Sequence, residues 1–449
     1  MFRWINDGAR LWPGSICVAL GLTLGFSSVF GADEQLAVEL DADSPLSDLV
    51  LYAEQNSPDL KAAEHLTQAA EERIQQARGL PDPRLQVSIA AVPIETRVGP
   101  QQGKISFDQT IPGRGKRGQR AQVASAEAET AQTVYELRRR ELGFRVADAY
   151  YELYLLARSI EITRDNRDIL IYVEQVVRKA YETGNAPYAD LIRSQVEIGK
   201  LENDLLSLND QQRAAAAHLN TLLHRDVDAP LPAPLVTDAP VILRSADELR
   251  DIVVNEAPEV RVLDSRLDGE AQRIRLAEID DRLDWNLSLS YVLIGSAAIA
   301  DLPDSGRDAV FAGVSIRLPV WGKKYRAAER EAHEREAAIR AARSEVGDRL
   351  SDRLERLLYR FENADREIRL YRDTLIPKSE QSLQASQAGL RTANVGVLDL
   401  VDTTRVLLQF QLAYERAVTE RARAAAELRY LFGEDVTITT GPDTRETAS

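Results

Sequence analysis

Residues that build disulfides, soft-metal sites and imidazole catalysis are scarce in this chain. Its 449 residues include one cysteine, one methionine and four histidines. A single cysteine cannot form an internal disulfide, and so few soft or imidazole ligands leave little for a resident metal centre. Positive charge is also in the minority, with a net charge of −15, whereas a nucleic-acid partner usually needs a clustered basic face. The sequence therefore predicts no cofactor, no metal site and no nucleic-acid partner.

The sequence also contains few candidate catalytic residues. The four histidines are scattered along the chain, at His65, His218, His224 and His333. His218 and His224 are six residues apart on a predicted helix, so they do not share a face. The sequence shows no nucleophile motif, phosphate loop or nucleotide fingerprint. These observations predict a protein that is not an enzyme.

The N-terminus has the pattern of a targeting segment. Arg3 and Arg10 precede an apolar run over about 16–30, and two small residues, Gly31 and Ala32, follow. The run is too short for a typical membrane-spanning helix. We therefore predict a signal peptide over 1–32; an uncleaved anchor is the alternative.

Two copies of one pattern make up the rest of the chain, offset by about 200 to 209 residues. Three motifs carry the match, and each recurs in the same order: Asn56–Leu60 with Glu256–Val260, Ile111–Arg117 with Leu318–Lys324, and Tyr181–Asn185 with Leu390–Asn394. The predicted domains are a first repeat over 45–225, a proline-containing linker over 226–244, a second repeat over 245–433 and a polar tail over 434–449.

Each repeat contains a long amphipathic helix. Apolar residues step by four and three from Leu142 to Ile160, and again from Leu350 to Ile368, which is a heptad seam. Pro377 should disturb the second helix locally. A shorter returning helix follows each long one, and one further helix precedes each pair of strands. The predicted ranges are 119–183 and 188–224, then 325–391 and 397–432, with the preceding helices at about 45–79 and 245–282.

Four segments alternate apolar and polar residues, as strands with one face of each kind do. They cover about 84–92, 103–111, 285–293 and 309–318, and the segments 93–102 and 294–308 are predicted loops. Each strand is long enough to cross a bilayer at a tilt. Two soluble surface hairpins are the alternative. If the strands span, four cannot close a barrel, whereas three copies supply twelve, which predicts a homotrimer.

Over roughly 45–435 the chain resembles the TolC-like outer-membrane efflux family. The carriers are the two-fold repeat, the lead Gly79–Pro83 into the first strand, the two Pro…Gly-Lys-Arg/Lys corners and the paired helix-hairpin turns. The resemblance implies a mostly α-helical fold with a small β part. Duplicated long helical hairpins would form a trimeric α-barrel, and four strands per chain would contribute to a 12-stranded outer-membrane β-barrel.

The resemblance also implies a location and partners. The location is the outer membrane of a Gram-negative bacterium, in contact with its lipid and with a long periplasmic part. The partners are a periplasmic adaptor (membrane fusion) protein and an inner-membrane pump of the resistance-nodulation-division type. The corners Ile111–Arg117 and Leu318–Arg326 look most like members that serve heavy-metal resistance pumps. The alternatives are the duct of a type I protein-secretion system and, in another class, a periplasmic coiled-coil adaptor or scaffold.

Carboxylates follow both helix-hairpin turns. Asp399 and Asp402 are three residues apart and share a helix face, so three copies would set six carboxylates around a narrow axis. The resemblance implies that aspartates in this Asp-x-x-Asp position line the periplasmic gate, with Asp190 as the first-repeat equivalent. Arg193 and Arg405 are candidates to pair with them. The alternative is that all five are ordinary surface charges, the acids being favoured at a helix start by the macrodipole.

The turns themselves are the predicted adaptor-docking sites, because their small residues permit close contact: Gly184, Asn185, Ala186, Asn394, Val395 and Gly396. Simple turn formation is the alternative. At the strand-to-helix corners, Lys116, Arg117, Lys323 and Lys324 are candidates to meet lipid headgroups, or else form a solvated cluster. Trp285, Tyr291 and Trp321 fit an interfacial aromatic belt.

Overall fold

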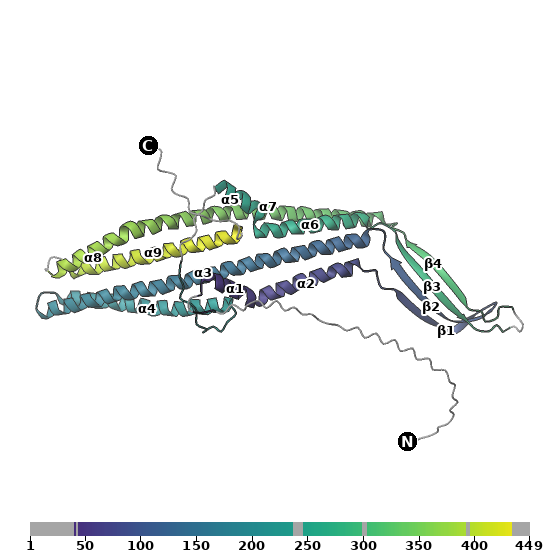
Figure 1. The fold of residues 1–449 in the computed structure, drawn as a ribbon, viewed down its shortest axis with the longest axis horizontal. Helices are drawn as coiled ribbons and strands as arrows, with labels where there is room; N and C mark the ends of the chain where they lie inside the picture. The colour runs from purple at the N-terminus through teal and green to yellow at the C-terminus, as the bar shows by residue number, and fades with distance from the viewer. Residues whose placement is uncertain (1–39, 42–43, 237–245, 299–302, 392–395, 433–449) are drawn as a thin grey trace, which may run out of the picture. The chain divides into compact units, whose positions relative to one another are not determined.

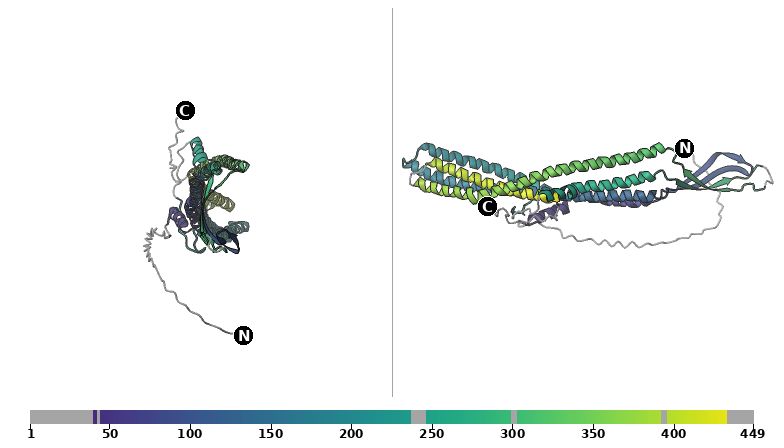
Figure 2. Two further views of the ribbon diagram at one scale, coloured as in Figure 1. Left: turned by 90° about the vertical axis from the view of Figure 1, so that its right-hand side faces the viewer. Right: turned by 90° about the horizontal axis from the view of Figure 1, so that it is seen from above.

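The computed structural model describes residues 40–41, 44–236, 246–298, 303–391 and 396–432, all within one unit, Val38–Ser449. The predicted signal peptide 1–32 and tail 434–449 lie outside the described residues, as does part of the predicted linker. The two repeats contain the same elements in the same order, with the strands at one end of the unit and the helix-hairpin turns at the other (Figure 1, Figure 2).

Each repeat begins with two short helices, continues with two strands and ends with the long helices. In the first repeat the elements are α1 (Leu46–Asn56), α2 (Pro58–Arg78), β1 (Arg84–Thr96), β2 (Gly99–Ile111), α3 (Lys116–Glu182) and α4 (Tyr188–Leu222). In the second they are α5 (Ala246–Glu256), α6 (Pro258–Ile279), β3 (Asp284–Ile294), β4 (Ala309–Arg317), α7 (Gly322–Leu370), the π-turn Tyr371–Leu375, α8 (Ile376–Arg391) and α9 (Val397–Phe432).

The helix before each strand pair is broken in two, where the sequence predicts one. The breaks fall at Pro58 and Pro258, each the first residue of its helix. Proline disfavours helical geometry in the preceding residue, and Ser57 is accordingly extended (φ −64°, ψ 118°). The Ser57 side chain then accepts from the Leu60 N–H, which caps α2. The recurring Pro motif of the sequence is therefore a helix junction.

The long helices bury the predicted heptad seam. α3 has 67 residues, about 100 Å at 1.5 Å per residue. Val146 and Leu153 are buried on α3, and Leu350, Leu354 and Leu357 are buried on α7. The disturbance predicted at Pro377 is a π-turn, in which the Ile376 N–H bonds to the Tyr371 carbonyl oxygen five residues back.

The four strands form one antiparallel sheet in the order β1-β2-β3-β4. Its two middle strands come from different repeats, with Ile105 opposite Tyr291. Alternation sorts the side chains as predicted, and we call the exposed set the apolar sheet face: Leu85, Val87, Ile89, Ile105, Phe107, Ile111, Trp285, Leu287, Leu289, Tyr291, Leu293, Val310, Val314 and Ile316. The mostly helical fold with a small four-stranded sheet is confirmed.

The first hairpin is longer than predicted, because 93–102 is largely strand rather than loop. β1 and β2 are joined through Arg97 and Val98 alone, with a register shift between Ile89 and Ile94. Gly99 has φ +130°, and an added Cβ would lie 1.7 Å from the Gly295 carbonyl oxygen. A glycine therefore permits both the tight turn and its contact with the second hairpin.

Candidate functional site

The tip of the helical hairpins is held by an apolar cluster that joins both repeats. Leu170, Val173 and Val177 of α3 pack with Leu400 and Leu407 of α9, together with further residues of α4 and α8. The cluster fixes the ends of the four helices relative to one another. Polar side chains that follow the turns are thereby placed on a defined scaffold.

The turn between α3 and α4 has the geometry expected of its sequence. Gly184 has φ +78°, and its N–H bonds to the Tyr181 carbonyl oxygen at 2.9 Å. Asn185 is exposed and donates to the Thr183 hydroxyl at 3.0 Å, while Ala186 is half-buried. In the second turn Gly396 is exposed, and Asn394 and Val395 lie outside the described residues.

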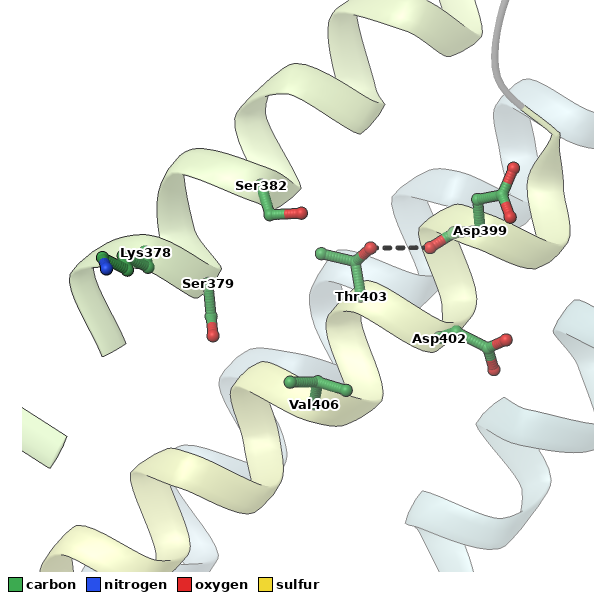
Figure 3. Close-up of a pocket in the computed structure, with 7 residues that line it drawn as sticks. All are labelled: Lys378, Ser379, Ser382, Asp399, Asp402, Thr403 and Val406. Atoms are coloured by element: carbon green, nitrogen blue, oxygen red, sulfur yellow. Dashed lines mark hydrogen bonds between the residues drawn. The ribbon is translucent and has the colours of Figure 1, made fainter. Parts of the chain in front are cut away.

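Asp399 and Asp402 project from the same side of α9 (Figure 3). They line a shallow depression of about 360 Å³ with Thr403 and Val406 of α9 and with Lys378, Ser379 and Ser382 of α8. The Thr403 hydroxyl donates to the Asp399 carbonyl oxygen at 2.7 Å. The structure therefore brings the predicted carboxylate pair together with hydroxyl groups.

Asp190 lines no part of that depression. It lies in the first turn of α4, where its Oδ1 is 3.5 Å from Arg193 Nη1. Its side chain is only 18% exposed. Counting 209 residues forward, Asp190 matches Asp399 and Arg193 matches Asp402. The two repeats thus differ in charge at the second position: α4 carries a compensated pair where α9 carries two acids.

Arg405 has a partner that the sequence analysis missed. Its guanidinium lies 3.0 Å from Asp402 Oδ1, as the i,i+3 spacing allows, and also 3.1 Å from Glu197 Oε2 on α4. The Arg405 hydrogen bond holds the pKa of Glu197 below its ordinary value. The sequence contained one indication of this partner. Asp190, Arg193 and Glu197 are spaced at i, i+3 and i+7, so Glu197 lies on the same face of α4 as the predicted gate residues. This bridge ties the α9 carboxylates to the other repeat.

Breaking the bridge should loosen the start of α9. We expect Arg405→Ala and Glu197→Gln each to raise backbone hydrogen exchange over 397–406 by about two- to fivefold at pH 7. Because the folded pKa of Glu197 is depressed, the bridge stabilises above the ordinary carboxyl range and is lost as pH falls through the folded pKa. The difference between wild type and Glu197→Gln should therefore be full above the ordinary carboxyl range and shrink as the pH falls below it.

The control for this experiment is Arg213→Ala, which removes an exposed ion pair with Asp210 inside α4 alone. Its exchange over 397–406 should equal that of the wild type. If Arg405→Ala also left this exchange unchanged, the bridge would contribute nothing to the order of the tip.

At the corner between β2 and α3, the structure contradicts the prediction that Lys116 meets lipid headgroups. Lys116 is only 2% exposed, and its Nζ lies 3.0 Å from Asp284 Oδ1. The Gly113 N–H donates to the same oxygen at 2.8 Å, and Arg317 Nη1 is 3.7 Å from Asp284 Oδ2. We call Gly113, Lys116, Asp284 and Arg317 the corner cluster. It joins the two repeats where the sheet meets the helices.

Two searches over the described part of the chain gave negative results. No group of three or more His, Cys, Asp or Glu side chains there is arranged to hold a metal ion. Among the same residues, no helix is both long and apolar enough to cross a membrane.

The described part of the chain thus combines long helical hairpins in two repeats with one antiparallel sheet that has an exposed apolar face. The model of the outer membrane efflux protein family matches residues 49–224. The resemblance predicted from the sequence is thereby confirmed. Proteins of this family are passive channels and not enzymes.

The chain is also similar to individual proteins. It is 23% identical over 380 residues to the cobalt-zinc-cadmium resistance protein CzcC of Cupriavidus metallidurans, covering 83% of this chain and 86% of that protein. Its fold matches the outer membrane protein VceC of Vibrio cholerae (TM-score 0.68, 19% identity, 86% of this chain and 96% of that one). It also matches CusC, described as forming a transmembrane channel (TM-score 0.74, 14% identity, 87% and 92%).

Proposed function

We propose that this protein is the outer-membrane channel of a tripartite efflux system in a Gram-negative bacterium. The observation that carries the proposal is the apolar sheet face, which spans all four strands and leaves residues such as Ile89 and Leu289 exposed at 83% and 53%. A soluble hairpin gains nothing from such a face, whereas lipid covers it favourably. The family match supports the same reading.

The working form is a homotrimer. β1 and β4 are the outer strands of the sheet, and an open strand edge is unfavourable in lipid because its backbone groups find no partner. Three copies supply twelve strands, which close a β-barrel and remove the edges. The long helices of the three copies would then form an α-helical tunnel through the periplasm.

The tip of this tunnel is the gate in our proposal. Asp399 and Asp402 of three copies would surround the axis, attract cations and repel one another when the tip closes. Arg405 limits that repulsion by bridging Asp402 to Glu197. Asp190 plays a smaller part, since Arg193 already compensates its charge.

The turns at the same tip would dock the periplasmic adaptor, through Gly184, Asn185, Ala186 and Gly396 of the described residues and through Asn394 and Val395. The exposure of Gly184 and Asn185 in the first turn supports this assignment. A pump of the resistance-nodulation-division type in the inner membrane would supply the energy, because the duct itself is passive.

The exported substrate is proposed to be divalent heavy-metal cations. The similarity to a cobalt-zinc-cadmium resistance protein supports this class. The scarcity of soft and imidazole ligands is compatible with it, since a duct conducts its cargo without holding it and a cation must leave as readily as it enters.

Deletion of the gene tests the proposal. The deletion strain should lose tolerance to cobalt, zinc or cadmium salts, and plasmid-borne wild type should restore it, while tolerance to uncharged drugs stays unchanged. The protein should fractionate with outer membranes and migrate as a heat-modifiable trimer. Loss of a secreted protein with normal metal tolerance would instead assign a type I secretion duct, and recovery as a soluble monomer would overturn the channel.

A further inference from the structure

Basic residues gather where the sheet meets the helices. The four connecting stretches 78–84, 112–120, 280–284 and 317–326 contain four acidic residues and eleven basic ones: Arg78, Arg84, Arg114, Lys116, Arg117, Arg120, Arg282, Arg317, Lys323, Lys324 and Arg326. The chain as a whole has a net charge of −15. This local excess of positive charge attracts anions.

The two long helices place these cations where the helix macrodipole opposes them. Neither α3 nor α7 has an acidic residue in its first turn, whereas α1, α2, α4, α5, α6 and α9 each have at least one. The positive end of a helix favours anions, so Lys-Arg or Lys-Lys at this position needs compensation from elsewhere.

α3 obtains that compensation inside the chain. Lys116 is buried against Asp284 at 3.0 Å, with Asp280 at 4.0 Å. The aligned residues of α7 are Lys323 and Lys324, 207 residues further on, and both are exposed. Neither forms an ion pair with any described residue; Lys324 Nζ lies 5.7 Å from the ring centroid of Tyr325. The second corner therefore has the same cations without the acid.

Exposed apolar residues adjoin these lysines. Leu318, Val320 and Trp321 are exposed at 65%, 69% and 76%, and they follow the last residue of β4, Arg317, directly in the chain. An indole beside ammonium groups at the edge of an apolar band suits the interface between lipid chains and headgroups.

A neighbouring copy would not supply the missing acid at the matching position. Asp284 is the first residue of β3, and 200 residues earlier the first residue of β1 is Arg84. If β4 of one copy pairs with β1 of the next, the residue equivalent to Asp284 is another cation. At this position the neighbouring copy therefore adds positive charge, which an anion from outside the protein would compensate.

We propose that the corner between β4 and α7 binds the phosphate of an anionic phospholipid through Lys323 and Lys324, with Trp321 at the adjoining acyl boundary. The inference rests on the proposed membrane function, which places this corner at a bilayer surface. Net negative charge on the headgroup is what distinguishes the preferred lipid, because zwitterionic phosphatidylcholine offers no net attraction.

Tryptophan quenching tests the site in the full chain. The variant Trp4→Phe/Trp12→Phe/Trp285→Phe leaves Trp321 as the sole tryptophan of four. It is reconstituted in phosphatidylcholine vesicles that contain an equal fraction of brominated phosphatidylglycerol or brominated phosphatidylcholine. Quenching by the anionic lipid should exceed quenching by the zwitterionic one by roughly threefold or more. Lys323→Gln/Lys324→Gln should equalise the two.

The matched control removes two exposed lysines far from this corner, Lys61→Gln/Lys179→Gln, and should retain the preference. Equal quenching by both lipids in the parent variant, or a preference that survives Lys323→Gln/Lys324→Gln, overturns the headgroup site while the membrane placement stands. Absence of quenching by either lipid overturns the inference together with the membrane placement.

Discussion

The variant Asp284→Asn is expected to lose about 3–5 kcal/mol of stability, which for a chain of this size corresponds to a fall in melting temperature on the order of 3–6 °C. The physical reason is the burial of Lys116, whose side chain is only 3% exposed. Asparagine keeps the shape and the acceptor for the Gly113 N–H, but it leaves the ammonium group without a charged partner closer than Asp280 at 4.0 Å. Removing one member of a buried ion pair costs far more than the pair contributes.

The same reasoning gives an order for the related variants. Lys116→Met should cost less than Asp284→Asn, because Asp284 keeps the Gly113 N–H at 2.8 Å and Arg317 at 3.7 Å. The double variant Lys116→Met/Asp284→Asn should recover part of the loss, since no buried charge is then unpaired. Thermal unfolding of detergent-purified protein, followed by circular dichroism, measures all three.

The duplicated sequence offers a matched control. Lys323→Met changes the aligned lysine, which is exposed and makes no ion pair among the described residues, so stability in detergent should change by less than about 0.5 kcal/mol. If Asp284→Asn proved as mild as Lys323→Met, the corner cluster would have no role in holding the sheet to the helices.

Alanine at both Asp399 and Asp402 is expected to weaken block of the channel by divalent cations about tenfold or more in planar bilayers. In the proposed trimer the double variant removes six carboxylates from one constriction. A cation held by several such charges loses more than the roughly 1.4 kcal/mol that corresponds to one factor of ten. Arg405 remains bound to Glu197 at 3.1 Å, so the variant tests charge without releasing the helix.

Two further variants separate the gate from general charge effects. Asp190→Ala should have a smaller effect, because that carboxylate is 18% exposed and is compensated by Arg193. Asp210→Ala removes an exposed acid about 30 Å further along α4, at 1.5 Å per residue, and should leave block unchanged. Conductance, selectivity and block that match the wild type in the Asp399/Asp402 variant would contradict the gate assignment.

The mostly helical fold with its four strands could be predicted from the sequence because both signals are local. The seam that contains Val146 and Leu153 repeats within a few turns, and alternation such as Trp285, Leu287 and Leu289 repeats within one strand. The duplication reinforced each signal with a second copy. The helix junction at Pro58 could also have been predicted locally, because proline disfavours helical geometry in the residue before it. We nevertheless predicted one continuous helix there.

The candidate site was only partly predictable. The i,i+3 spacing of Asp399 and Asp402 determines that they share a face of α9, and the structure places them there. It does not determine the partner of Arg405, because Glu197 is 208 residues away in the chain. Nor does it show that Asp190 is compensated on its own helix while the equivalent aspartate faces an open depression.

The sequence by itself determined the repeat, the elements and the types of residue at each corner. Only the tertiary structure decided that Lys116 is buried and Lys323 exposed, although both stand in the same motif. The reason is that their environments are set by the neighbouring strand: β3 brings Asp284 to Lys116 across 168 residues, whereas β4 is the outer strand of the sheet and brings no acid to Lys323.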